Sequence, residues 1–231
     1  MDYAHQSSEL LAKIEGHIAK GGQKTASGMQ AAVEPLLEWL GHLHAHERTG
    51  TGDEFLDGVR SLTLEAVGGA SVGLYRSCIL SMRGQIDALF SWLYFKDHRV
   101  ELDRVFRENE GYRSKRESFE YLSDYYPRFS SRFDILKAAR TRTSPDPYRA
   151  LSAHVHSIGF DTIPQLSSLA DMVGDDATAG QCVDVQKEVV EFMTDVLLSC
   201  FAAKWASLPD AIMDAAKARL SSEKLATLVA S

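Results

Sequence analysis

Hydrophobic residues along this chain recur at intervals of three and four positions, and the alternating pattern of β-strands is nearly absent. That periodicity is typical of amphipathic helices. The strongest example runs from Leu74 to Lys96, where one broad face is apolar: Leu74, Cys78, Ile79, Met82, Ile86, Leu89, Phe90 and Leu93. The pattern therefore predicts an all-α protein built as a helical bundle.

Breaks in the pattern divide the first half of the chain into further helices. The glycines of "KGGQ" are expected to cap the N-terminal helix after Ile18, and a second helix is expected from about Gly28 to His46. Asp53 is the expected N-cap of a third helix. It reaches toward "VGGASVG", which lacks the lysine of a P-loop and is expected to be a bend or a close helix crossing. Shorter helices are predicted over Glu101–Asn109, Ser114–Tyr125 and Ser130–Ala139.

Toward the C-terminus the pattern predicts long helices. One runs from about Gln181 to Trp205, and Pro209 can open another. The first carries an apolar face suited either to the core or to a second copy or partner protein: Val189, Val190, Phe192, Met193, Val196, Leu197 and Phe201. With no internal repeat or long linker, residues 1–231 are expected to form a single domain.

Composition narrows the class of protein. Hydrophobic residues make up 45% and charged residues 25%, as in soluble globular proteins. A net charge of −7 argues against a protein that is basic all over and coats nucleic acid, but allows a local basic cleft. Three cysteines without a CxxC pair indicate neither a zinc site nor a disulfide framework. No signal peptide or membrane-spanning run is visible, so a cytoplasmic protein is expected.

The segment "YRALSAHVHS" carries the candidate chemistry. On a helix starting at Pro147, Arg149, Ser152 and His156 share a face, because seven residues make nearly two turns. His154 points elsewhere, about 160° away from His156. Histidine can act as an acid or a base near neutral pH, and arginine presents a fork of donors to phosphate oxygens. These residue types fit a site that acts on a phosphodiester.

This segment resembles the signature of the HEPN superfamily. That signature is an arginine and a histidine with four to six residues between them, on a late helix of a small all-α domain. Here six residues separate Arg149 from His156, and four separate it from His154. The segment is also similar to the Tyr-x-x-Leu-Ser-x-x-Val-His pattern of HEPN-like proteins. The resemblance covers approximately residues 74–159 and implies a HEPN-like core with packed flanking helices.

The resemblance implies a function. Many HEPN proteins are metal-independent ribonucleases of toxin–antitoxin or anti-phage defence systems, and a second copy often completes the cleft. It implies RNA as substrate, a homodimer and no cofactor, with Arg149 and His156 at the active cleft and His154 as the alternative histidine. Active members often have a polar residue directly after the arginine, where this chain has Ala150. Two other interpretations therefore stay open: a catalytically inactive HEPN-like subunit of a larger complex, or an unrelated helical protein that binds a ligand or partner.

The helix from Leu74 to Lys96 adds polar candidates. Arg76, Arg83 and Asp87 lie along one stripe at seven- and four-residue spacing. If this helix packs beside the Arg149 helix, Asp87 is placed to orient Arg149, and Arg83 adds positive charge for substrate binding. The other interpretation is an ordinary Arg83–Asp87 surface pair of little energetic consequence.

Basic residues outnumber acidic ones from Tyr112 to Arg149 by nine to five, a net charge of +4. This excess predicts a basic rim beside the motif, in which Arg140 and Arg142 bind RNA. The same segment holds five aromatic residues that suit either base stacking or the core: Tyr121, Tyr125, Tyr126, Phe129 and Phe133.

A second histidine cluster lies in "EPLLEWLGHLHAHE". Glu34, Glu38, His42 and His46 follow at four-residue steps, whereas His44 points away. Carboxylate and imidazole groups one turn apart can share a metal ion. Nothing else in the chain clearly supplies the remaining ligands, so the segment is expected to be a solvated helix face, and no metal site is predicted.

Overall fold

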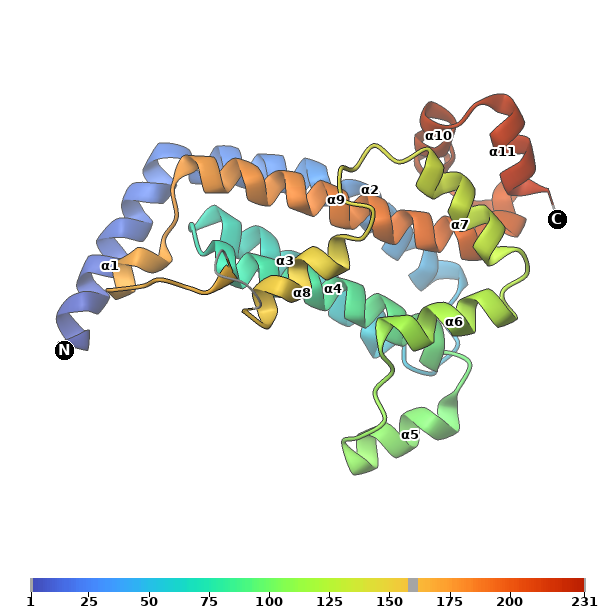
Figure 1. The fold of residues 1–231 in the computed structure, drawn as a ribbon, viewed down its shortest axis with the longest axis horizontal. Helices are drawn as coiled ribbons and strands as arrows, with labels where there is room; N and C mark the ends of the chain where they lie inside the picture. Colours follow the sequence, from blue (N-terminus) through green and yellow to red (C-terminus); the bar gives the residue numbers. More distant parts are fainter. Residues whose placement is uncertain (1, 158–161, 231) are drawn as a thin grey trace. The chain divides into compact units, whose positions relative to one another are not determined.

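The computed structural model of the chain describes residues 2–157 and 162–230. Within these residues every regular element is helical, which confirms the all-α prediction (Figure 1). The chain forms two compact units. The first comprises Met1–Glu34, Ser61–Gln85 and Asp146–Val189, and the second Pro35–Arg60, Ile86–Pro145 and Val190–Ser231.

The helices follow the predicted breaks closely between Leu74 and Ala139, within a few residues at each end. In chain order the elements are α1 (Tyr3–His17), a π-helical turn (Ile18–Gly22), α2 (Gln23–His46), α3 (Glu54–Ser71), α4 (Tyr75–Phe95), α5 (Arg99–Glu108), α6 (Lys115–Tyr125), α7 (Phe129–Ala138), α8 (Pro147–Val155), a 3-10 turn (Leu169–Met172), α9 (Asp176–Phe201), a 3-10 segment (Ala202–Ser207), α10 (Asp210–Arg219) and α11 (Ser222–Val229).

The prediction that "KGGQ" ends the first helix is wrong. The chain passes from α1 through the π-helical turn directly into α2. Gly22 has a packing role instead, because a Cβ atom there would lie 2.6 Å from the carbonyl oxygen of Ser71. The glycine therefore allows α3 to approach the backbone closely, a use that local sequence does not distinguish from a helix cap.

The second glycine-rich stretch behaves as predicted. α3 ends at Ser71 and α4 begins at Tyr75, so "VGGASVG" contains the bend between them. A Cβ atom on Gly69 would lie 3.3 Å from the backbone nitrogen of Cys78, and Gly73 has a positive φ of 82°. Both positions therefore favour glycine, one for a close crossing and one for its backbone conformation.

The long C-terminal helix starts earlier than predicted. α9 begins at Asp176, because the carboxylate of Asp175 accepts hydrogen bonds from the backbone nitrogen (2.9 Å) and hydroxyl (2.7 Å) of Thr178. A side chain that pairs these donors begins a helix in the manner of an N-cap. α9 ends at Phe201, where a 3-10 segment takes over, and α10 follows Pro209 as predicted.

The first unit packs α4 against α9 through buried polar side chains. The amides of Gln85 and Gln186, both fully buried, donate to each other at 3.3 and 2.9 Å. The buried thiols of Cys78 and Cys182 also share a hydrogen bond, and this bond together with burial raises the pKa of Cys78. Pairing satisfies groups that would otherwise be costly to bury.

The second unit has an aromatic core. The ring of Phe201 lies 6.3 Å from that of Trp39 and 6.4 Å from that of Trp92, measured between centroids. The apolar face predicted on the long C-terminal helix is at most 5% exposed: Val189, Val190, Phe192, Met193, Val196, Leu197 and Phe201. Of its two predicted roles, this face serves the core and offers no exposed apolar surface to a partner.

Asp53 stands before α3, as predicted for an N-cap, but its carboxylate orders the preceding loop. It accepts hydrogen bonds from the backbone nitrogens of Thr49 and Gly50 and from Nε1 of Trp92. Burial raises the pKa of Asp53, but these bonds and one from Arg48 outweigh burial, so the pKa lies below its usual value. The carboxylate therefore stays charged and fixes the turn between α2 and α3.

No single helix in the described part of the chain is both long enough and apolar enough to cross a membrane. One sharply bent pair, 169–207 with Asp210–Arg219, meets the length and composition criteria together.

Candidate functional site

α8, which carries the Arg149 motif, packs against α4 in the first unit, which is the arrangement that the roles of Arg83 and Asp87 require. Arg83 on α4 donates from Nε to Oγ of Ser152 at 3.0 Å and from a terminal nitrogen to the hydroxyl of Tyr148. Its guanidinium carbon lies 3.5 Å from the centroid of the Tyr148 ring. One side chain thus fixes two positions of α8 that lie about one turn apart, Tyr148 and Ser152.

A second arginine of α4 holds the C-terminal end of α8. Arg76 donates to the carbonyl oxygen of His154 (3.1 Å), to Oγ of Ser157 (3.3 Å) and to the carbonyl oxygen of Thr162 (3.3 Å). The last carbonyls of a helix lack intrahelical donors and carry partial negative charge, so a cation there is favourable. Arg76 and Arg83 together form what we call the α8 clamp.

The clamp places positive charge beside the motif. Burial lowers the pKa of Arg83, and the neighbouring Tyr148 and Asp146 oppose that effect. Arginine nevertheless stays protonated in proteins. Its two hydroxyl partners on α8 are neutral, and the carboxylate of Asp146 is an opposite charge close to it.

The two residues predicted to be central to catalysis lie at the surface of this helix. Arg149 is exposed on α8, and His156 is exposed at its C-cap with φ −90° and ψ 0°. α8 ends at Val155, and Ser157 has a positive φ of 50° that turns the chain away. Within the described residues, neither side chain forms a hydrogen bond or ion pair. Both groups are therefore accessible to a ligand.

His154 is placed differently from His156. It lines a pocket of about 350 Å³ in the first unit, whose other walls include Arg76, Leu80, Leu166 and Met172. Leu80, Leu166 and Met172 are each at least 40% exposed, so the pocket has an open apolar rim. Of the two histidines in the motif, the alternative one thus faces a cavity, and the first choice faces solvent.

The remaining predicted site residues belong to the second unit. Asp87 is exposed on α4, and Arg140 is exposed after α7, where its guanidinium donates to the carbonyl oxygen of Lys137 at 2.9 Å. Their roles beside Arg149 stay predictions.

Arg142 does not fit the predicted role in RNA binding. Its side chain is fully buried and pairs with Glu191 at 2.9 Å and Asp195 at 2.5 Å. Arg219 pairs with the same carboxylates, at 3.4 and 2.8 Å. We call these four residues the Arg142 ion network. It commits Arg142 to carboxylates of the protein, so this guanidinium is not presented to a phosphate.

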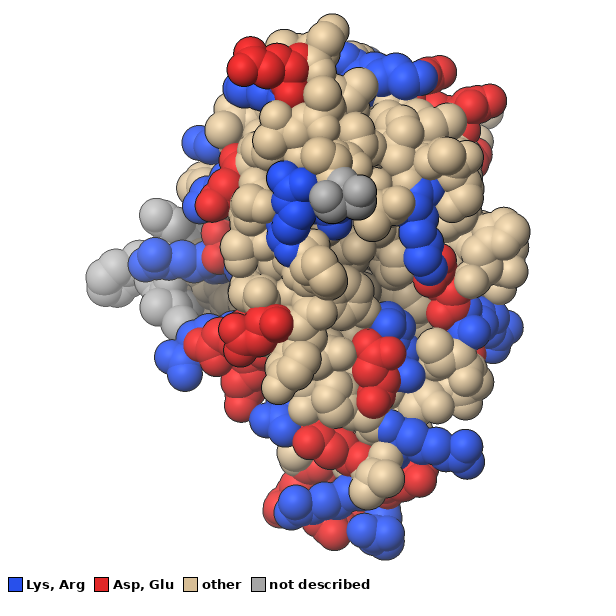
Figure 2. Space-filling view, turned by 90° about the vertical axis from the view of Figure 1, so that its right-hand side faces the viewer, with Lys and Arg blue, Asp and Glu red and all other residues tan. Residues whose placement is uncertain are grey.

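Other basic side chains between Tyr112 and Arg149 also bind groups of the second unit itself. Arg113 pairs with Glu101 at 3.1 Å, Arg116 pairs with Glu120 at 3.4 Å, and buried Arg132 donates to backbone carbonyls. On the face drawn in Figure 2, basic and acidic side chains are interleaved, without one continuous basic surface. The predicted basic rim is therefore narrower than the sequence count indicates.

The aromatic residues of that segment divide between the two predicted roles. Phe129 and Phe133 are buried in the core of the second unit, with their rings stacked at a centroid distance of 5.9 Å. Tyr125 is 72% exposed, and Tyr121 is partly buried. Of the five, Tyr125 is the side chain most available for base stacking.

The second histidine cluster shows no metal geometry. The rings of His42 and His46 are in contact, with centroids 4.9 Å apart, and Glu34 and Glu38 are exposed. Burial lowers the pKa of His42, and the charge of His46 lowers it further. Nowhere in residues 2–157 and 162–230 do three or more His, Cys, Asp or Glu side chains converge to hold a metal ion.

Two contributors to the α8 site were not assigned from sequence. Arg76 lies on the predicted stripe of α4 but has no predicted role, and Tyr148 is not among the predicted site residues. The seven-residue spacing from Arg76 to Arg83 was the available signal, because it aims both side chains at the same neighbouring helix.

Comparisons of this chain with models of known protein families, with curated proteins and with solved structures find no match.

Proposed function

We propose that this protein is a HEPN-like, metal-independent endoribonuclease whose cleft is built on α8, with Arg149 and His156 as its central residues. One observation carries the proposal: the α8 clamp fixes this short helix at both ends, while Arg149 and His156 are exposed on it. A fixed support that presents an arginine and a histidine to solvent suits recognition of a phosphodiester.

The chemistry follows from these two residue types. The imidazole of His156 takes the proton of a ribose 2′-hydroxyl, and that oxygen attacks the adjacent phosphorus. The P–O5′ bond breaks, and an acid returns a proton to the leaving oxygen. The guanidinium of Arg149 binds the phosphate oxygens, on which negative charge develops. The products are a 2′,3′-cyclic phosphate and a 5′-hydroxyl, and neither step needs a metal or cofactor.

A second copy of the chain is the proposed source of the acid, because one motif offers a single histidine next to Arg149. The proposal thus includes a cytoplasmic homodimer, of the kind expected in a toxin–antitoxin or antiviral defence system. Arg83 supports α8 from the side of α4 through its hydrogen bond to Ser152, and Asp87 and Arg140 are the further proposed contributors. His154 is the alternative base, because it lines the neighbouring pocket.

The test is cleavage of single-stranded RNA by the purified chain in EDTA, with the ends of the products analysed. We expect cyclic phosphate ends from the wild type and a loss of at least about a hundredfold in rate for Arg149→Ala and His156→Ala. His5→Ala is the matched control, since His5 is also exposed and belongs to the same unit.

Three results would reject parts of the proposal. Activity retained by His156→Ala and lost in His154→Ala would transfer the acid–base role to His154. Cleavage that stops in EDTA would exclude the metal-independent mechanism. If Arg149→Ala and a double histidine variant both cleave RNA at the wild-type rate, α8 does not carry the active site.

The open apolar rim of the His154 pocket favours a second candidate function, a catalytically inactive HEPN-like interaction subunit. Leu80 is 43%, Leu166 is 53% and Met172 is 40% exposed around one pocket. Exposed apolar residues gathered in one place are typical of interaction sites. Absence of RNA cleavage, together with a dimer in light scattering that Leu166→Lys dissociates, would select this function.

A further inference from the structure

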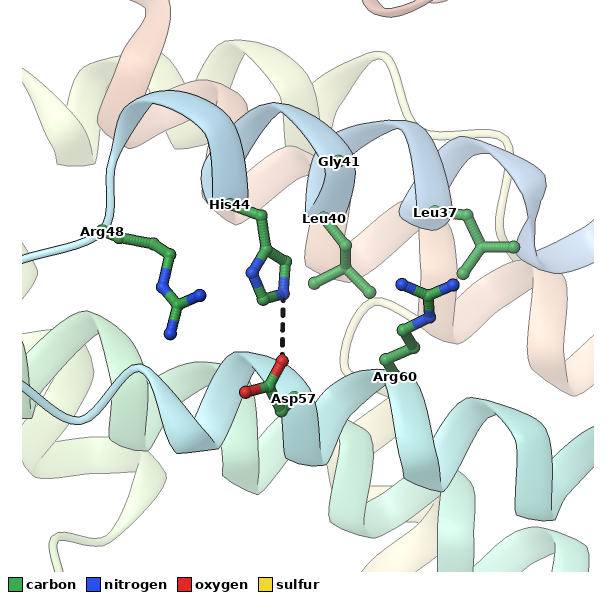
Figure 3. Close-up of a pocket in the computed structure, with 7 residues that line it drawn as sticks. All are labelled: Leu37, Leu40, Gly41, His44, Arg48, Asp57 and Arg60. Atoms are coloured by element: carbon green, nitrogen blue, oxygen red, sulfur yellow. Dashed lines mark ion pairs between the residues drawn. The ribbon is translucent and has the colours of Figure 1, made fainter. Parts of the chain in front are cut away.

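A second pocket lies in the second unit, between α2 and α3, and it was not anticipated from sequence. Its volume is about 490 Å³, and Figure 3 shows its walls. Leu37 and Leu40 form an apolar part, while His44 and Asp57 face each other across the gap, with Nε2 and Oδ1 3.4 Å apart. The sequence singled out the neighbours of His44 on α2 and set His44 aside because it points away from them.

Two arginines stand on opposite sides of the His44–Asp57 pair, as Figure 3 shows. Arg48 pairs through Nε with Asp53 at 3.3 Å, so its positive charge is neutralised by the carboxylate that orders the loop between α2 and α3. Arg60 on α3 is exposed and, within the described residues, has no hydrogen bond or ion pair from its side chain. Among the lining cations, Arg60 is therefore the one available to an external anion.

The walls divide into parts of different chemistry. The exposed guanidinium of Arg60 offers a fork of donors to an anion, in the same pocket wall as Leu37 and Leu40. Asp57 has a side chain that is 61% exposed, and a carboxylate readily accepts hydrogen bonds from sugar hydroxyls. The volume lies within the range of about 300–1,000 Å³ that is usual for small-molecule sites.

We propose that this pocket binds a ribose phosphate, either as a sugar phosphate or as part of a nucleoside monophosphate. Arg60 takes the phosphate, and Asp57 with His44 takes the ribose hydroxyls. In a nucleotide, the base lies on Leu37 and Leu40. The inference rests on the walls of this pocket and is independent of the proposed ribonuclease activity of α8.

Gly41 provides a way to close the pocket. It lies on α2 in the pocket wall, and a Cβ atom there would meet no atom of the described residues within 4 Å. A Cβ atom is therefore accommodated at this position, and the longer side chain of Gly41→Leu is expected to occupy the space of the pocket. Replacement of glycine inside a helix also favours the helical conformation. Loss of binding in this variant is thus separable from loss of folding.

The experiment is calorimetric titration of the full chain with adenosine 5′-monophosphate, ribose 5-phosphate and adenosine, each to millimolar concentration. We expect at least one of the two phosphates to bind about tenfold or more tightly than adenosine, since adenosine has no anion for Arg60. Much tighter binding of the nucleotide identifies a nucleotide site, and equal binding of both phosphates identifies a sugar phosphate site.

Variants locate the binding. Arg60→Gln is expected to weaken phosphate binding at least about fivefold, and Gly41→Leu to abolish it. Arg99→Gln removes an exposed arginine from α5 in the same unit and should leave the affinity within about twofold. Any of three results would overturn the proposal. Adenosine could bind as tightly as the monophosphate, or neither phosphate could bind. Alternatively, Arg60→Gln and Gly41→Leu could both leave phosphate binding unchanged.

Discussion

Two arginine centres, one in each unit, use the same side chain in different ways. Arg83 in the first unit donates to the hydroxyls of Ser152 and Tyr148. Arg142 in the second unit pairs with the carboxylates of Glu191 and Asp195, which Arg219 also contacts. The first arrangement joins an arginine to two hydroxyls, with the carboxylate of Asp146 near enough to raise its pKa, and the second is a network of two cations and two anions.

The difference separates a structural centre from a candidate functional one. Opposite charges in the Arg142 ion network cancel, so little potential remains for an external ligand. Arg83 instead holds α8 through two hydroxyls, so its side chain fixes the helix that presents Arg149. The sequence alone does not distinguish these two roles, because it predicts substrate binding for both Arg83 and Arg142.

Breaking the Arg142 ion network should have the largest effect on stability. Arg142→Met leaves Asp195, which is 1% exposed, with one cation fewer. Removing one partner of a buried ion pair costs about 3–5 kcal/mol. We expect the free energy of unfolding to fall by that amount in urea denaturation. Arg140→Met, at an exposed position nearby in sequence, should change it by less than about 0.5 kcal/mol. Equal effects of the two variants would contradict the structural role of the network.

Breaking the α8 clamp should have a smaller effect that is local to α8. Arg83→Met removes charged hydrogen bonds to Ser152 and Tyr148, which are worth about 1.5–3 kcal/mol. We expect faster amide hydrogen exchange in α8, measured by mass spectrometry. Arg83→Lys should restore this protection only in part, since an ammonium lacks the fork that reaches two hydroxyls. Unchanged exchange in α8 after Arg83→Met would show that the clamp does not hold the helix.

The smallest effect concerns acid stability. Burial raises the pKa of Glu191, but hydrogen bonds from Thr141 and the charges of Arg219 and Arg142 outweigh it, so the folded-state pKa lies below the usual 4.5. Stability from this carboxylate is therefore fully present above about pH 4.5 and is lost as the pH falls through the folded pKa. We expect Glu191→Gln to flatten the decline in unfolding free energy between pH 4.5 and lower pH, measured by urea denaturation at each pH. A decline as steep as that of the wild type would assign acid sensitivity to other carboxylates.

The helices were predictable because their signals are local. The apolar face of α4 and the capping box of Ser114 and Glu117 at the start of α6 depend on residues within a few positions. The same local rule failed at Gly22, where the deciding contact is the backbone of Ser71 on another helix. The sequence therefore mispredicts helix ends where a tertiary contact decides them.

The candidate sites were predictable only in part. Helical spacing placed Arg83 on one stripe with Asp87, and Ser152 on one face with Arg149. The structure adds the contact between Arg83 and Ser152. Spacing does not reveal which cation meets a carboxylate far away in the chain. The sequence therefore predicts an RNA contact for Arg142, whereas the structure pairs its side chain with Glu191 and Asp195. The pocket around His44 depends likewise on Asp57 and Arg60 of a different helix.

The boundary between the two units crosses four helices without interrupting them. It falls after Glu34 in α2, after Arg60 in α3, after Gln85 in α4 and after Val189 in α9. A cut inside a helix exposes backbone donors and acceptors that need new partners. Neither unit is therefore a continuous piece of chain that can be shuffled into another protein or released by a protease, and insertions are better tolerated in the loops than at the boundary.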